Sequence, residues 1–177
     1  MFKKKEKKVV LYFVDDDELH LKIIQGKFNT SSNYEFYSYK TGEEFLDNLI
    51  KKKIQKNIYQ IVILDYYLNS NENSDAKNGI EILKIVKEIK PSIEVIMLSA
   101  MDDVNIVTTA MHYGAITFVK KNENCFTRIQ NNINWIISQK DLESKKRSHR
   151  ITRYFFFVVL SVIIVASLLY IMVEYSR

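Results

Sequence analysis

The stretch IVILDYY, residues 61–67, places the carboxylate of Asp65 directly after four apolar residues. A short apolar run that is rich in isoleucine and valine is typical of a buried β-strand. A charged group at the end of such a strand costs free energy unless another charge, a hydrogen-bond donor or a metal ion compensates it. The position of Asp65 therefore indicates a functional site rather than a packing position.

Five apolar runs of strand length alternate with five segments of helical periodicity between residues 9 and 138. The predicted strands are 9–14, 34–39, 59–64, 93–98 and 116–120, and the predicted helices lie within 15–28, 41–53, 79–89, 102–114 and 124–138. Parallel strands that are joined by helices are buried on both faces of their sheet, which explains why the runs are continuously apolar. We therefore predict an α/β fold of five βα units with right-handed connections.

The residues that directly follow the strands share a polar character. They are Asp15-Asp16, Asp65, Ser99-Ala100 and Lys120-Lys121. In an open parallel sheet the carboxyl ends of the strands form the ligand site, so we expect these side chains to converge. Three carboxylates repel one another and need a cation, and a site of oxygen ligands suits Mg²⁺.

A carboxylate that is flanked by a hard metal ion, a hydroxyl and an ammonium group can attack phosphorus. The cations neutralise charge on the phosphoryl oxygens and so stabilise the transition state. An acid that only caps a helix is a sufficient explanation for Asp17 and Asp103, but Asp65 is followed by Tyr-Tyr-Leu and not by a helix. We therefore predict that Asp65 accepts a phosphoryl group.

Residues 7–138 resemble the receiver domain of two-component response regulators. Five motifs occur in the order and spacing of that family, namely LYFVDDDELHLKII (11–24), IVILDYYL (61–68), NGIEILK (78–84), VIMLSA (95–100) and GAITFVKKNEN (114–124). The resemblance implies a flavodoxin-like, doubly wound parallel sheet with the strand order 2-1-3-4-5. It also implies a sensor histidine kinase or a phosphotransfer protein as the phosphoryl donor.

The resemblance also implies a role for each residue of the site. Asp65 resembles the phospho-acceptor, Asp15 and Asp16 resemble the acidic pair that holds Mg²⁺ with Asp65, and the backbone carbonyl of Tyr67 completes the metal shell. Ser99 and Phe118 resemble the switch residues, and Lys121, with Lys120 as its neighbour, resembles the lysine of the site. Asp65, Ser99 and Lys121 are the expected catalytic set. The family further implies a face of helix 4, strand 5 and helix 5 that changes on phosphorylation and could form a homodimer.

This chain departs from the family pattern at three places. Asn122 replaces the proline that usually follows the lysine, the proline that usually lies a few residues after the phospho-acceptor is missing, and the loop that includes residues 69–78 is longer than is usual. Its Asn, Ser and Asp content indicates a solvated loop, whose role the sequence does not identify. The histidines His20, His112 and His149 are scattered, and we interpret them as residues of helix surfaces.

Residues 154–173 form a second apolar region, YFFFVVLSVIIVASLLYIMV, with twenty residues and no charge. A helix of this length spans about 30 Å, the thickness of the hydrocarbon core of a bilayer. Five basic residues precede it, whereas only Arg177 follows it, and such an asymmetry places the preceding part in the cytoplasm. We predict a receiver domain at 1–138, a basic juxtamembrane linker at 139–153, a transmembrane helix at 154–173 and a short outer tail at 174–177.

These observations predict a phospho-accepting receiver of a phosphorelay that is tethered to the bacterial inner membrane by a single span. It would signal by phosphorylation-dependent protein contact. We do not expect it to be an enzyme, apart from slow removal of the phosphoryl group from its own aspartate. A receiver fold that is never phosphorylated and serves as an adaptor is the alternative. A DNA-binding regulator is disfavoured because 139–153 is too short for such a domain, so we expect no nucleic-acid partner. A hydrolase would need an acid/base after the nucleophile, which Tyr67 cannot readily supply.

Charge and cysteine content add little to this prediction. The formal net charge is +5, and residues 141–177 contribute +3 of it. Beside an apolar span, a basic segment is explained by membrane orientation and by attraction to anionic lipid headgroups. The single cysteine, Cys125, excludes an internal disulfide, and we assign it no function.

Overall fold

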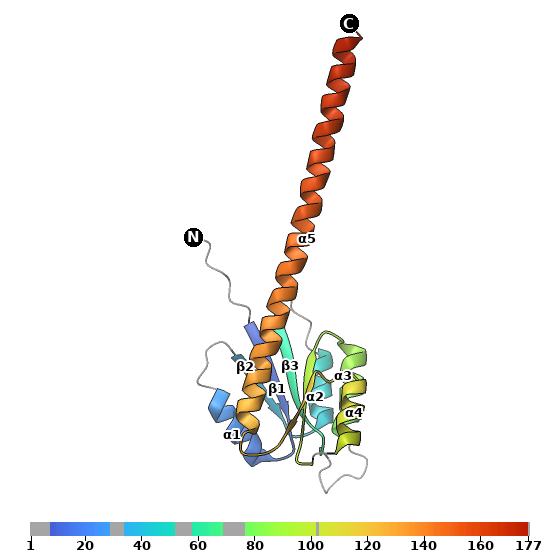
Figure 1. Ribbon diagram of the computed structural model, residues 1–177. Helices are drawn as coiled ribbons and strands as arrows, with labels where there is room; N and C mark the ends of the chain where they lie inside the picture. Colours follow the sequence, from blue (N-terminus) through green and yellow to red (C-terminus); the bar gives the residue numbers. More distant parts are fainter. Residues whose placement is uncertain (1–7, 29–33, 52–57, 69–76, 102, 177) are drawn as a thin grey trace. The chain divides into compact units, whose positions relative to one another are not determined.

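The computed structural model describes residues 8–28, 34–51, 58–68, 77–101 and 103–176. The strands are β1 (Lys8–Val14), β2 (Tyr34–Tyr39), β3 (Ile58–Asp65), β4 (Glu94–Ser99) and β5 (Thr117–Lys120), and the helices are α1 (Glu18–Phe28), α2 (Gly42–Lys51), α3 (Gly79–Ile89), α4 (Val104–His112) and α5 (Cys125–Tyr175). All strands pair in parallel in the order β2-β1-β3-β4-β5 (Figure 1). The predicted flavodoxin-like sheet is therefore confirmed. Of the loop at 69–78, residues 69–76 lie outside the described residues.

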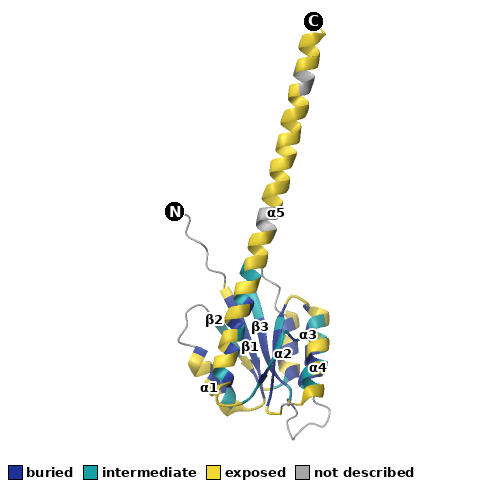
Figure 2. Cartoon of the chain, viewed as in Figure 1, coloured by how far each residue is buried: buried dark blue, intermediate teal, exposed yellow. Residues whose placement is uncertain are grey.

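The sheet is covered on both faces, as its continuous apolar runs require. Alternate residues of β1, such as Tyr12, pack on the face that α2, α3 and α4 cover. On the other face Phe13 contacts Phe28 of α1, which in turn contacts Phe126 at the beginning of α5. Figure 2 shows the strands as the most buried part of the molecule. Full burial of one such large apolar side chain contributes about 1.5–3 kcal/mol.

The strand register aligns the residues that follow each strand. Val14 pairs with Leu64, so the next residues, Asp15 after β1 and Asp65 at the end of β3, are neighbours. Asp65 itself pairs with Leu98, the residue before Ser99. Ser99 pairs with Lys120, and Lys121 follows directly. Parallel pairing thus brings four separate segments of the sequence to one edge of the sheet.

Helix α5 is longer than the sequence periodicity indicated. We expected the last helix of the receiver to end near residue 138, but α5 continues to Tyr175. The reason is local, because no glycine or proline interrupts residues 125–175. The chain forms two compact units, Met1–Asn134 and Trp135–Arg177, and α5 contributes residues to both.

The second unit contains a strongly apolar segment. The most apolar window of 18 residues has a mean hydropathy of 2.9, and none of it is buried. Large side chains such as Phe155, Ile163 and Met172 are exposed, and Figure 2 colours most of the C-terminal part of α5 as exposed. By length and composition, this is the one helix among the described residues that could cross a membrane.

Candidate functional site

Three carboxylates meet at the carboxyl edge of the sheet. Asp15 follows β1, Asp65 ends β3, and they are only 2% and 3% exposed, whereas Asp16 is exposed. One oxygen from each of Asp15, Asp16 and Asp65 lies within 4.8 Å of the others. Because buried carboxylates without a cation repel one another, this cluster is suited to a divalent metal ion.

Lys121 supplies the cation that balances the cluster. Its Nζ donates to Asp65 Oδ2 at 2.6 Å and to Asp15 Oδ2 at 2.8 Å. The lysine is held in place by its backbone, since its N–H donates to the carbonyl of Ser99 at 2.8 Å. Of the two adjacent lysines, Lys120 is the last residue of β5, and the structure brings Lys121, which follows it, to the carboxylates.

The two buried carboxylates have opposite pKa shifts. Burial raises the pKa of Asp65 to about 6, although the charge and hydrogen bond of Lys121 oppose this effect. Burial would also raise the pKa of Asp15, but the hydrogen bond from His20 and the charge of Lys121 outweigh it and lower that pKa. For Lys121, burial opposes the charged form, yet the charges of Asp15 and Asp65 raise its pKa. A proton that enters this buried pair is therefore held by Asp65 in preference to Asp15.

One oxygen of Asp65 has no hydrogen-bond partner. Asp65 Oδ1 is buried and accepts nothing from the described residues. Buried polar atoms without a partner are rare, because they lose hydration without compensation. A hard cation that is bound by the three carboxylates would satisfy this atom, so the residues fit Mg²⁺.

Ser99 and Phe118 flank the edge from β4 and β5. Ser99 is fully buried, and its Oγ accepts the backbone N–H of Met101 at 3.2 Å. Phe118 is partly buried and packs against the core on the face that carries α4. A change at the hydroxyl of Ser99 can therefore affect the segment that leads from β4 to α4.

Tyr67 extends across the strand ends toward the residues that follow β4. Its ring is 40% exposed and contacts the edge of Tyr66, and its hydroxyl donates to Met101 Sδ at 3.2 Å. Burial raises the pKa of the Asp65 carboxyl, and the nearby backbone N–H of Tyr67 opposes this effect. The ring therefore leans toward Met101 and does not simply point to solvent.

His20 was missed by the sequence interpretation, which placed it on a helix surface. The structure contradicts that interpretation, because the ring is half-buried and its Nδ1 lies 2.6 Å from Asp15 Oδ2. His112 is exposed, as expected, and the side chain of His149 lies outside the described residues. A signal for His20 was present, since it lies in the first turn of α1, directly after the acidic residues of the edge.

Gly79 allows the backbone after Asp65 to pack against the beginning of α3. A Cβ at this position would lie 2.2 Å from the carbonyl oxygen of Asp65 and 2.8 Å from the Cα of Tyr66. The Gly79 N–H donates to the carbonyl of Tyr66 at 2.9 Å, and the side chain of Asn78 caps α3. Only glycine fits at this position of the edge.

Gly79→Ala should therefore destabilise the receiver by about 1–3 kcal/mol, because the new methyl group collides with backbone that cannot easily move. The matched control is Gly26→Ala in α1, where a Cβ meets nothing within 4 Å. That change should stabilise the helix by about 0.5–1 kcal/mol. Thermal unfolding of the two variants and the wild type measures both effects. Equal midpoints for Gly79→Ala and the wild type would contradict the close approach.

The sheet order and the acidic edge together define a doubly wound α/β protein with three carboxylates and a lysine gathered at the carboxyl ends of its strands. The family model of the response regulator receiver domain matches residues 11–133. The chain belongs to the response regulator receiver domain family. This family consists of phospho-accepting signalling modules of two-component systems, and its members typically bind Mg²⁺ at an acidic pocket.

Solved structures support the same assignment. The BeF3-activated receiver domain of DrrB is 26% identical, with a TM-score of 0.56, and the match covers 72% of this chain and 98% of that domain. A CheY-like receiver domain protein from Methanospirillum hungatei JF-1 has a TM-score of 0.64 at 20% identity, covering 77% and 98% of the two chains, and shares the fold. None of the curated proteins that were compared with the chain matches it.

Proposed function

We propose that this chain is a membrane-tethered receiver whose Asp65 accepts a phosphoryl group from a sensor histidine kinase or a phosphotransfer protein. The observation that carries the proposal is the arrangement around Asp65. One of its oxygens is bound by Lys121 at 2.6 Å, and the other is buried without a partner in a cluster of three carboxylates. An adaptor that only binds proteins would not need this costly arrangement.

The site residues divide the chemistry among them. Asp15, Asp16 and Asp65, with the backbone carbonyl of Tyr67, would hold Mg²⁺, which when bound neutralises charge on the phosphoryl oxygens. An oxygen of Asp65 forms a bond to phosphorus while the bond between phosphorus and the donor breaks, and the donor's leaving group takes a proton. Lys121 exchanges its contacts with the carboxylates for a contact with a phosphoryl oxygen.

Ser99 and Phe118 would change their contacts when Asp65 is phosphorylated. The hydroxyl of Ser99 donates to a phosphoryl oxygen, which changes its contact with the backbone of Met101. Phe118 packs on the α4 side of the sheet, so a shift at the end of β4 alters the packing that surrounds it. The output is a changed surface on α4, β5 and the beginning of α5, which could bind a partner or a second copy of the chain.

The apolar segment of the second unit would anchor the chain in the bacterial inner membrane as a single span. Its support is the hydropathy of 2.9 over 18 residues, together with the basic residues before residue 154. The distribution of basic residues favours a cytoplasmic receiver. The receiver could then meet the cytoplasmic part of a kinase without free diffusion through the cell.

The direct test is phosphorylation of the full-length chain in detergent micelles. With a small phosphodonor and Mg²⁺ we expect intact-mass spectrometry to show one added phosphoryl group, which hydroxylamine removes because it is an acyl phosphate. Chelation of Mg²⁺ should abolish the addition. If no phosphoryl group is added at any Mg²⁺ concentration, the adaptor function is supported instead.

Tyr67 should prolong the phosphorylated state. Its hydroxyl bonds to Met101 beyond the end of β4, and we expect the ring in this position to crowd the line of approach of a hydrolytic water. Tyr67→Asn should therefore lose the phosphoryl group several-fold faster than the wild type. Tyr67→Phe keeps the ring and removes only the hydroxyl contact, so it should decay at nearly the wild-type rate. If the asparagine variant and the wild type lose the phosphoryl group at the same rate, the ring has no protective effect and Tyr67 contributes only its backbone carbonyl.

A further inference from the structure

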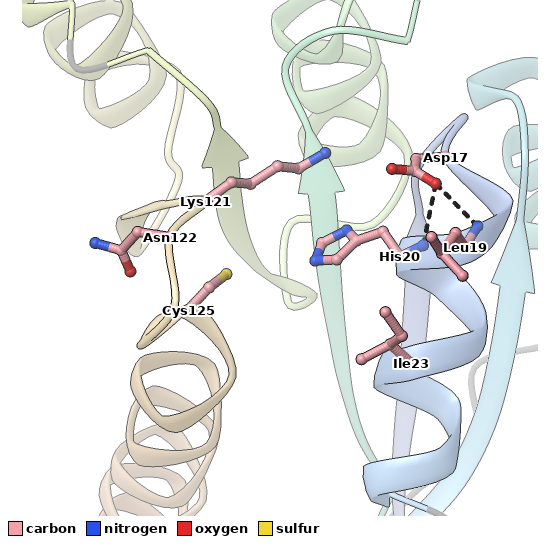
Figure 3. Close-up of a pocket in the computed structure, with 7 residues that line it drawn as sticks. All are labelled: Asp17, Leu19, His20, Ile23, Lys121, Asn122 and Cys125. Atoms are coloured by element: carbon pink, nitrogen blue, oxygen red, sulfur yellow. Dashed lines mark hydrogen bonds between the residues drawn. The ribbon is translucent and has the colours of Figure 1, made fainter.

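His20 is held by a bond to Asp15 beside the acidic edge. Its Nδ1 lies 2.6 Å from Asp15 Oδ2, and its ring lines the same pocket as Cys125, the first residue of α5. Figure 3 shows the ring between α1 and the segment that carries Lys121 and Cys125. A half-buried imidazole that is bonded to a buried carboxylate has a defined orientation, which a residue of a helix surface does not need.

Few hydrogen-bond donors orient the carboxylate of Asp15. Its Oδ1 accepts the backbone N–H of Asp17 at 3.1 Å, and its Oδ2 accepts from Lys121 at 2.8 Å and from His20 at 2.6 Å. Lys121 is shared with Asp65 and moves to the phosphoryl group in the proposed reaction. His20 is then the side chain that remains on Asp15 Oδ2 throughout the cycle.

The ring acts through Asp15 and not as a ligand of the metal. Among the described residues, the donor atoms that lie within 4.8 Å of one another come from Asp15, Asp16 and Asp65, and His20 is not part of this group. Groups that hydrogen-bond to a metal ligand fix its orientation, and their loss typically weakens metal binding by about 10–100-fold. The contact between His20 and Asp15 has this geometry.

We propose that His20 is a positioning residue that holds the carboxylate of Asp15 in the orientation that binds Mg²⁺. This inference rests on the proposed function, since it assumes that the acidic cluster binds the metal. The imidazole keeps Asp15 in place when Lys121 leaves it, so the metal site stays ordered during phosphoryl transfer. The role belongs to the Nδ1 side of the ring, because that nitrogen faces Asp15.

The test is the Mg²⁺ affinity of the full-length chain in detergent micelles, measured by isothermal titration calorimetry. His20→Leu should bind Mg²⁺ about tenfold more weakly. His20→Asn, whose amide nitrogen can occupy the place of Nδ1, should bind within about threefold of the wild type. His20→Gln places its nitrogen farther from the backbone, near the place of Nε2, and should bind as weakly as the leucine variant.

Two control measurements distinguish the proposed effect from other causes of weaker binding. His112→Leu removes an exposed histidine of α4 and should leave Mg²⁺ affinity unchanged. Thermal unfolding of each variant without Mg²⁺ separates a lost fold from a lost orientation, and the asparagine and glutamine variants can be compared even if the leucine variant unfolds.

The outcomes separate this inference from the proposed function. If the wild type binds no Mg²⁺, the proposed function itself is wrong. If the wild type binds Mg²⁺ and folded asparagine and glutamine variants bind it equally well, the positioning role is wrong. Tighter binding by His20→Leu would also overturn it, because the imidazole would then compete with the metal for Asp15.

Discussion

Asp65→Asn is expected to abolish phosphorylation of the chain completely. The asparagine has nearly the same shape and would still lie at the end of β3, but it offers no carboxylate oxygen to attack phosphorus. The full-length variant and the wild type are incubated with the same phosphodonor and Mg²⁺, and the added mass is measured over time. We expect one phosphoryl group on the wild type and none on the variant.

The matched control for this experiment is Asp103→Asn. Asp103 is exposed and caps α4 through its bond to the N–H of Asn105 at 2.8 Å, a task that asparagine performs equally well. This variant should be labelled at the wild-type rate. Undiminished labelling of Asp65→Asn would show that another residue accepts the phosphoryl group, and the assignment of the site would be wrong.

Removal of residues 154–177 should transfer the chain from the membrane fraction to the soluble fraction. The twenty uncharged residues at 154–173 provide enough apolar surface to hold a helix in a bilayer, whereas the remaining chain ends in a basic segment. Full-length protein should resist extraction by carbonate, and the truncated protein should remain in the supernatant. The basic segment alone should produce at most a weak, salt-sensitive association.

Protease protection tests the orientation in the same preparation. In intact spheroplasts the receiver should be resistant to an external protease, and it should be digested after the inner membrane is opened. A full-length chain that is recovered as soluble protein would refute the anchor. Digestion of the receiver from the outer side would retain the anchor and reverse the orientation.

Much of the fold could be predicted because each strand is a short apolar run that is bounded by polar residues. The run before Asp65 has a strand pattern in the sequence and is completely buried in the structure. The convergence of the carboxylates follows from parallel pairing, since the carboxyl ends of such strands share one edge. The choice of Lys121 over Lys120 came from the family resemblance, because spacing alone did not distinguish two adjacent lysines.

The remaining features depend on contacts that sequence periodicity does not contain. His20 lies on α1 and Cys125 on α5, so the pocket that both residues line requires the packed arrangement of both helices. The close approach of Gly79 to Asp65 likewise depends on how α3 packs behind the edge. The length of α5 was underestimated because the predicted helix was limited to the periodic segment 124–138, although the charged residues that follow it form helices well.

The register of the sheet determines which changes in length the site can tolerate. Asp15, Ser99 and Lys121 are each placed by where a strand stops, and no loop between the elements sets their spacing. Insertions in the connections therefore leave the distances at the edge unchanged, whereas removal of one residue from β3 would turn Asp65 to the opposite face of the sheet. The chain can acquire new recognition loops while its chemistry stays constant, provided that its strands keep their lengths.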